Sequence, residues 1–122
     1  MANWQKLNYP ENKFQPFHIR LDYCDEDISL TDIYGRDDDP EWVEKTAQEI
    51  ADGHKYFVVL RAKVYLAGVE LASHSLGGLL FDSTEQMENM MRIDYEGIIA
   101  EAVDEAKHNL NKMSEAMSGV TA

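Results

Sequence analysis

The carboxylates are the side chains whose types and spacing come nearest to a metal site. Asp25-x-Asp27-x-Ser29 begins like a calcium-binding EF-hand loop, which needs glycine at its sixth position and glutamate at its twelfth. Leu30 and Arg36 occupy those positions. We therefore expect no dedicated metal site and no cofactor, although the spacing leaves weak, opportunistic calcium binding open.

The histidines and the single cysteine do not point to a zinc site or a thiol enzyme. Zinc ligands recur at short, characteristic intervals, and the histidines do not: His18, His54, His74 and His108. Cys24 is followed by Asp25, whose charge should raise the pKa of the thiol and weaken it as a nucleophile. One cysteine also cannot close an internal disulfide.

A second candidate for chemistry is Ser73-His74-Ser75-Leu76-Gly77-Gly78, which is similar to the Gly-x-Ser-x-Gly turn of α/β-hydrolases. Ser73 stands where that strained turn needs its first glycine, and Leu79-Leu80-Phe81 follows where it needs a helix. A chain of 122 residues is also too short for that fold. We interpret the segment as a glycine-rich turn or bulge and expect no enzyme and no catalytic residue.

The distribution of charge is the most informative feature of the chain. There are 23 acidic and 11 basic residues, with a formal net charge of −12. Residues 22–44 carry −9 of this charge, because Arg36 is the only base among ten acids. Such a field repels nucleic acid and anionic membranes and attracts basic surfaces. The acids predicted to bind a partner are Asp22, Asp25, Glu26, Asp27, Asp32, Asp37, Asp38, Asp39, Glu41 and Glu44.

The elements that must position these acids are those of one α+β domain over residues 1–122. Proline and polar residues predict an irregular arm over 1–16. Alternation of apolar and polar residues predicts strands in four stretches: 17–23, 56–66, 69–74 and 79–82, the last two separated by Gly77-Gly78. The acidic stretch itself, with Ile28, Leu30 and Ile33 between carboxylates, has the pattern of a short strand or turn.

Helical spacing and end signals predict the remaining elements. Asp39-Pro40 starts a helix that Gly53 ends, and Ser83 starts another that runs to about Arg92. A long C-terminal helix follows, with an apolar stripe that reaches Met117. We therefore expect an antiparallel sheet of three to four strands with the helices packed on one face.

The C-terminal stripe leaves two interpretations open. Five of the six methionines lie in residues 87–117, and flexible thioethers suit adaptable interfaces. The same stripe also suits packing against the core of the domain. A self-association surface and a core face are therefore both compatible with this pattern.

The N-terminal residues lack the apolar core of a secretory signal, and the longest apolar run, 56–60, is too short to span a bilayer. We therefore expect a cytoplasmic protein that binds neither membranes nor nucleic acid directly.

Residues 64–106 resemble small proteins encoded by phages, prophages and plasmids. The likeness rests on Ala67-Gly68-Val69-Glu70-Leu71-Ala72-Ser73, then Ser75-Leu76-Gly77-Gly78, and a helix around Tyr95 to Ala106. These motifs are structural, and the resemblance implies only a genomic setting. Small acidic proteins of such elements include anti-CRISPR and anti-restriction inhibitors. This chain is analogous to them in class and not in sequence.

The acidic charge and the genomic setting that the resemblance implies together favour an acidic inhibitor that blocks the basic nucleic-acid-binding surface of a target complex. A small homo-oligomeric structural or scaffolding protein without enzymatic activity is the alternative. A solvated acidic face that serves solubility alone is the plainest interpretation of the same charge.

Overall fold

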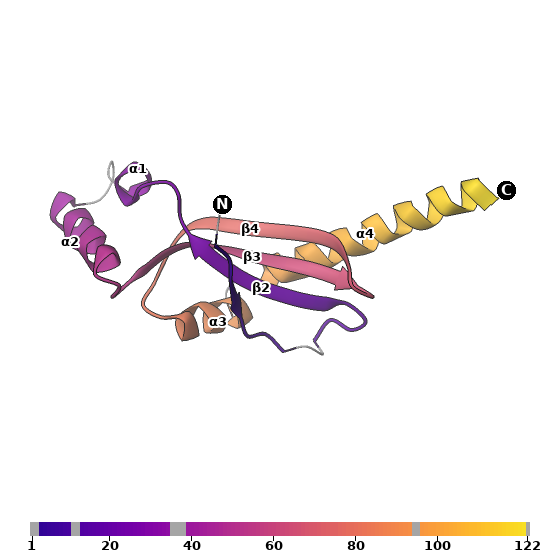
Figure 1. Ribbon diagram of the computed structural model, residues 1–122, viewed down its shortest axis with the longest axis horizontal. Helices are drawn as coiled ribbons and strands as arrows, with labels where there is room; N and C mark the ends of the chain where they lie inside the picture. Colours follow the sequence, from indigo (N-terminus) through magenta and orange to yellow (C-terminus); the bar gives the residue numbers. More distant parts are fainter. Residues whose placement is uncertain (1–2, 11–12, 35–38, 94–95, 122) are drawn as a thin grey trace.

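The computed structural model describes residues 3–10, 13–34, 39–93 and 96–121 (Figure 1). These residues form four strands and four helices. In chain order the elements are β1 (Gln5–Leu7), β2 (His18–Asp25), α1 (Leu30–Tyr34), α2 (Pro40–Ala51), β3 (Tyr56–Leu66), β4 (Val69–Phe81), α3 (Thr84–Ile93) and α4 (Glu96–Thr121).

The strands form an antiparallel sheet in the order β1-β2-β3-β4, so each strand pairs with its neighbour in the sequence. Ala67-Gly68 joins β3 to β4, and both residues have the positive φ that a tight type I′ hairpin turn requires. The predicted α+β class and antiparallel sheet are confirmed. The prediction of an irregular arm over 1–16 is corrected, because Gln5–Leu7 pairs with β2 and extends the sheet.

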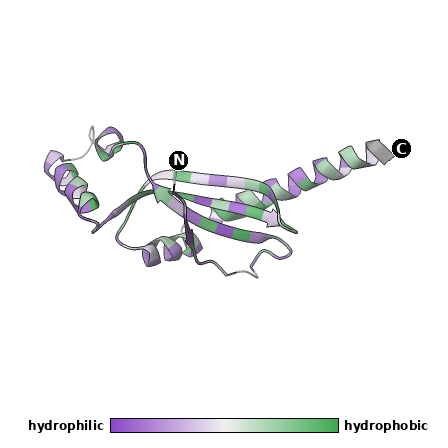
Figure 2. Cartoon of the chain, viewed as in Figure 1, coloured by the Kyte–Doolittle hydropathy of each residue, from purple (hydrophilic) through white to green (hydrophobic). Residues whose placement is uncertain are grey.

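One face of the sheet is buried under α3 and α4. Figure 2 shows the alternation of hydrophobic and hydrophilic residues along β2 and β3 that produces this face. The β3 side chains that point to the helices are at most 2% exposed: Val58, Leu60, Ala62 and Val64. The helices bury an equally enclosed set against them: Met87, Met91, Ile99, Ala102 and Ala106. The strand that alternation predicted over 56–66 is confirmed as β3, and its buried residues follow the period of two.

β4 runs without a break from Val69 to Phe81, which corrects the prediction of two short strands separated by Gly77-Gly78. A β-bulge absorbs the two glycines between the pairs Leu60↔Leu76 and Val58↔Leu79. Gly78 has a φ of 71°, a conformation that residues with a side chain rarely adopt. The glycines therefore mark an irregularity inside one strand and not its end.

Between β2 and β3 the chain leaves the sheet and forms a small helical unit, the α1–α2 lobe (residues 26–55). Leu30, Val43 and Phe57 form its hydrophobic cluster, separate from the main core. Phe57 alternates with the buried residues of β3, so the lobe packs on the sheet face opposite α3 and α4. The prediction that the helices pack on one face of the sheet therefore holds for α3 and α4 and not for α1 and α2. Helix α1 replaces the strand or turn that the sequence predicts for this stretch.

Helix α4 has 26 residues, a length of about 39 Å, and only its first half packs against the sheet. Ile99, Val103 and Ala106 are buried, whereas the side chains from Asn111 to Ser118 are all exposed. In Figure 1 this second half projects beyond the sheet, at the end of the molecule opposite α2. The predicted long C-terminal helix is confirmed.

Candidate functional site

The α1–α2 lobe concentrates negative charge at one end of the molecule (Figure 1). Its residues 26–55 include ten acids and three bases, a net charge of −7 out of −12. Of the acids predicted to bind a partner, six have exposed side chains: Asp25, Asp27, Asp32, Asp39, Glu41 and Glu44. Asp37 and Asp38 lie outside the described residues. Most of the predicted site that the structure describes therefore faces solvent.

The local sequence fixes how α2 presents its acids. Asp39 is the N-cap, and its Oδ1 accepts a hydrogen bond from the Glu41 backbone N–H at 3.0 Å, with Pro40 starting the helix. Val43 packs into the lobe, which leaves Glu44 on the solvent side of the helix. A shallow surface groove runs along this side and is lined by Glu41, Glu44, Lys45, Gln48 and Glu49.

Asp22 differs from the other predicted acids because its side chain is completely buried. Its Oδ1 accepts a hydrogen bond from Arg61 Nε at 2.8 Å, and its Oδ2 accepts one from Arg61 Nη2 at 2.7 Å. Arg20 Nε lies 3.6 Å from the same carboxylate, and the ring of Trp4 covers the Arg61 guanidinium at 3.6 Å. Asp22 offers no surface to a partner, so its assignment is corrected to a structural ion pair between β2 and β3.

Glu26 connects the α1–α2 lobe to the bulge in β4. Its Oε2 accepts a hydrogen bond from the Gly78 backbone N–H at 2.7 Å, and the Tyr34 hydroxyl donates to the Gly78 carbonyl at 2.8 Å. A Cβ on Gly77 would lie 2.7 Å from the same Glu26 oxygen, so a side chain at this position would displace the carboxylate from the Gly78 N–H. Glu26 is half-buried, and its carboxylate satisfies a backbone group that the bulge leaves unpaired.

The thiol of Cys24 is shielded from reaction. Burial raises its pKa above the usual value, and the carboxylate of Asp27 raises it further. The carboxylates therefore act in the predicted direction, but burial is the larger cause. With 6% of its surface exposed, Cys24 is poorly suited to act as a nucleophile.

The serine motif does not form a nucleophile turn. Ser75 lies inside β4 opposite Arg61, and the strand continues to Phe81 with no helix directly after the motif. The Nε2 atom of His74 instead contacts the carboxylate of Glu105 in α4. The strand-turn-helix geometry that would expose a reactive serine is therefore missing from this described stretch.

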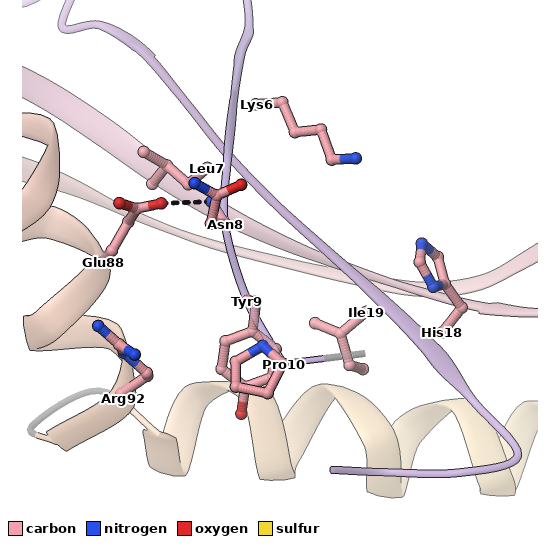
Figure 3. A pocket seen from close by; sticks show the side chains of 9 residues that line it. All are labelled: Lys6, Leu7, Asn8, Tyr9, Pro10, His18, Ile19, Glu88 and Arg92. Carbon is pink, nitrogen blue, oxygen red and sulfur yellow. Dashed lines mark hydrogen bonds between the residues drawn. The ribbon is translucent and has the colours of Figure 1, made fainter. Parts of the chain in front are cut away.

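A pocket of about 370 Å³ lies where the chain after β1 separates from β2, beside α3 (Figure 3). Lys6 of β1 and Arg92 of α3 bring cationic groups to it, and His18 of β2 adds an imidazole ring. Glu88 accepts a hydrogen bond from the Asn8 backbone N–H at 2.5 Å. The Glu88 carboxylate lines the same pocket as Lys6 and Arg92, so the charges of the lining favour neither an anionic nor a cationic ligand. No sequence pattern indicated it, because its lining comes from segments far apart in the chain.

Two further properties hold for the part of the chain that the structure describes. No three histidine, cysteine or acidic side chains come together as metal ligands. Nor is any described helix both long enough and apolar enough to cross a bilayer.

Comparisons with known protein families, with curated proteins and with solved structures found no significant match. The resemblance to proteins of phages and plasmids therefore stays a prediction.

Proposed function

We propose that this protein is an acidic inhibitor that uses the α1–α2 lobe to occupy a basic, nucleic-acid-binding surface of another protein. The observation that carries the proposal is the net charge of −6 on the described residues of the lobe, 26–34 and 39–55, at one end of the molecule. Exposed carboxylates there take the place of phosphates against a cleft lined by lysine and arginine. An anti-CRISPR or anti-restriction protein of a mobile element is the specific version that we propose.

The construction of the lobe supports this role. Capping at Asp39, a cluster around Val43 and the Glu26–Gly78 hydrogen bond hold the exposed acids on a fixed surface. Ordering a flexible acidic segment on binding would cost conformational entropy for each immobilised residue. A surface that is already ordered avoids most of that cost.

The test compares two variants that remove equal charge from different places. The lobe variant is Glu41→Gln with Glu44→Gln, and the control is Glu101→Gln with Asp104→Asn on the exposed side of α4. Each immobilised protein receives bacterial lysate that contains restriction and CRISPR complexes, and bound proteins are eluted with salt. Loss of two exposed charge pairs at about 0.5–1 kcal/mol each should weaken binding about five- to thirtyfold.

Support requires that the wild-type protein and the control retain a nucleic-acid-binding complex, that DNA or RNA displaces it, and that the lobe variant retains it weakly. The purified target must then lose its nucleic-acid binding when the wild-type protein is added. Equal retention by the lobe variant, or no retained complex, contradicts the proposal.

The alternative is a small homo-oligomeric structural or scaffolding protein. It draws on the projecting half of α4, which carries exposed Met113 and Met117.

A further inference from the structure

The projecting half of α4 continues the apolar seam that its first half packs against the sheet. From Ile99 onward, apolar residues recur at alternating intervals of four and three, the spacing of a coiled-coil seam: Ile99, Val103, Ala106, Leu110, Met113 and Met117. The first three are buried in the main core. Leu110 is half-buried at the edge of the sheet, and Met113 and Met117 are 48% and 66% exposed.

Beyond the sheet the seam forms a shallow apolar groove of about 330 Å³, lined by Leu110, Met113, Ser114, Met117 and Ser118. The two serines are small, so another backbone can approach this side of the helix closely. A helical segment of three turns is marginal in water without tertiary packing. The seam continues the buried stripe of α4 and its apolar side chains are exposed, so a second helix packed on it would bury them.

We propose that the seam over residues 110–117 pairs with the same seam of a second copy of this chain. The charge of the seam favours a second copy of the chain as the binding partner. The seam residues 110–117 contain one lysine and one glutamate, so this segment has no net charge in a chain of −12. Two copies therefore meet at this helix without the repulsion that opposes contact between their acidic surfaces.

The same argument favours an antiparallel arrangement. In a parallel pair the two acidic bodies would lie side by side at one end of the helices. In an antiparallel pair they lie at opposite ends, Met113 of one copy faces Met117 of the other, and the helix dipoles oppose. The contact is then two-fold symmetric and closed.

The size of the seam sets the expected strength of the dimer. Three apolar side chains per copy, with their small neighbours, bury far less than the roughly 800 Å² per partner of a standard stable interface. We therefore expect a weak dimer that forms in the range of about 10–1,000 µM.

The test is sedimentation equilibrium of the full chain at concentrations from roughly 10 µM to 1 mM. We compare Met113→Glu, which adds charge to the seam, with Asn111→Glu, which adds the same charge about 200° around the helix. Wild type and Asn111→Glu should dimerise with similar affinity. Met113→Glu should weaken dimerisation by at least about tenfold, as a buried unpaired carboxylate requires.

A monomeric wild type at the highest concentration overturns the proposal, as does equal dimerisation by Met113→Glu. Circular dichroism checks helix content, and the uncharged Met113→Gln serves in its place if Met113→Glu unfolds. Orientation is tested with cysteine variants at Met113 and Met117, because the native Cys24 is buried. Oxidation should cross-link the mixture of the two variants faster than either alone. The reverse result contradicts the antiparallel arrangement.

The dimer does not depend on the function proposed for the α1–α2 lobe. Met113→Glu should weaken dimerisation and leave a lobe–target complex intact at low concentration. The Glu41 and Glu44 substitutions should weaken that complex and leave dimerisation unchanged.

Discussion

Removing one partner of the buried ion pair between Asp22 and Arg61 should strongly destabilise the protein. Asp22 is fully buried and both of its oxygens accept hydrogen bonds from Arg61, whose side chain is 18% exposed. Replacing Arg61 with methionine keeps much of the volume of the side chain and removes the charge. The carboxylate then stays in the sheet without its main partner.

The structure sets the size of the effect. Breaking a buried pair from one side costs about 3–5 kcal/mol, because the remaining charge is uncompensated. Arg20 is already 3.6 Å from Asp22 and has a 45% exposed side chain, so it can move closer and recover part of this cost. We expect Arg61→Met to lower the free energy of unfolding by about 2–4 kcal/mol, a large share of the roughly 5–15 kcal/mol typical of a domain.

The assay is urea denaturation followed by far-UV circular dichroism, because Trp4 covers Arg61 and its fluorescence will change with the substitution. The double variant Asp22→Leu with Arg61→Met replaces the pair by apolar groups. Its loss in the free energy of unfolding should be smaller than the sum of the two single losses by at least about 2 kcal/mol. As a control, Lys13→Gln removes the partly exposed ion pair with Glu96 and should cost less than about 1 kcal/mol.

Two results would refute this reasoning. One is a loss below about 1 kcal/mol for Arg61→Met, which would mean that Asp22 is not buried as the structure describes. The other is additivity in the double variant, which would mean that the two side chains do not interact.

Three further predictions concern the bulge, a buried tyrosine and the thiol. Gly77→Ala and Glu26→Gln should each lower the free energy of unfolding by about 1–3 kcal/mol, because both weaken the hydrogen bond from the Gly78 N–H to Glu26. The double variant should therefore lose less than the sum of the two single losses, which a double-mutant cycle in urea measures. Burial raises the pKa of Tyr9 from 10.0 to about 12, so the wild type should lose stability as pH rises between these values, since the unfolded chain ionises first. The Tyr9 hydroxyl has no hydrogen-bond partner among the described residues, so Tyr9→Phe should retain stability at pH 7 and lack part of that alkaline loss in denaturation curves. Iodoacetamide at pH 8 should label Cys24 far more slowly in the native protein than in urea, and equal rates would contradict its burial.

Local patterns predicted the elements whose signals lie within a few residues. The alternation along 56–66 predicted β3 because side chains in a strand point to opposite faces in turn. Asp39-Pro40 predicted the start of α2, and the stripe that reaches Met117 predicted α4. The exposure of six of the ten acids follows from residue type, since charged side chains rarely lie inside without a partner, and their binding to a partner stays a prediction.

What sequence could not predict depends on contacts between distant residues. Asp22 looks like one more acid in an acidic stretch, and its burial follows from Arg61, 39 residues later. Glu26 is held by Gly78, 52 residues away, through a bulge that glycine content alone does not distinguish from a turn. The pocket in Figure 3 combines three segments in the same way.

The two ends of the α1–α2 lobe meet where the pairing of β2 with β3 ends, so the acidic surface is an insertion between two paired strands. Asp25 pairs with Val58, and the Glu26 N–H donates to the Phe57 carbonyl at 2.9 Å, so the register of β2 and β3 is fixed outside the lobe. Lengthening such an excursion costs little closure entropy, roughly 0.6 kcal/mol for each doubling. The strand pairing therefore does not depend on the length of the α1–α2 lobe. A short turn in place of residues 27–55 should leave the register of β2 and β3 unchanged, at the cost of the Tyr34 hydrogen bond to Gly78.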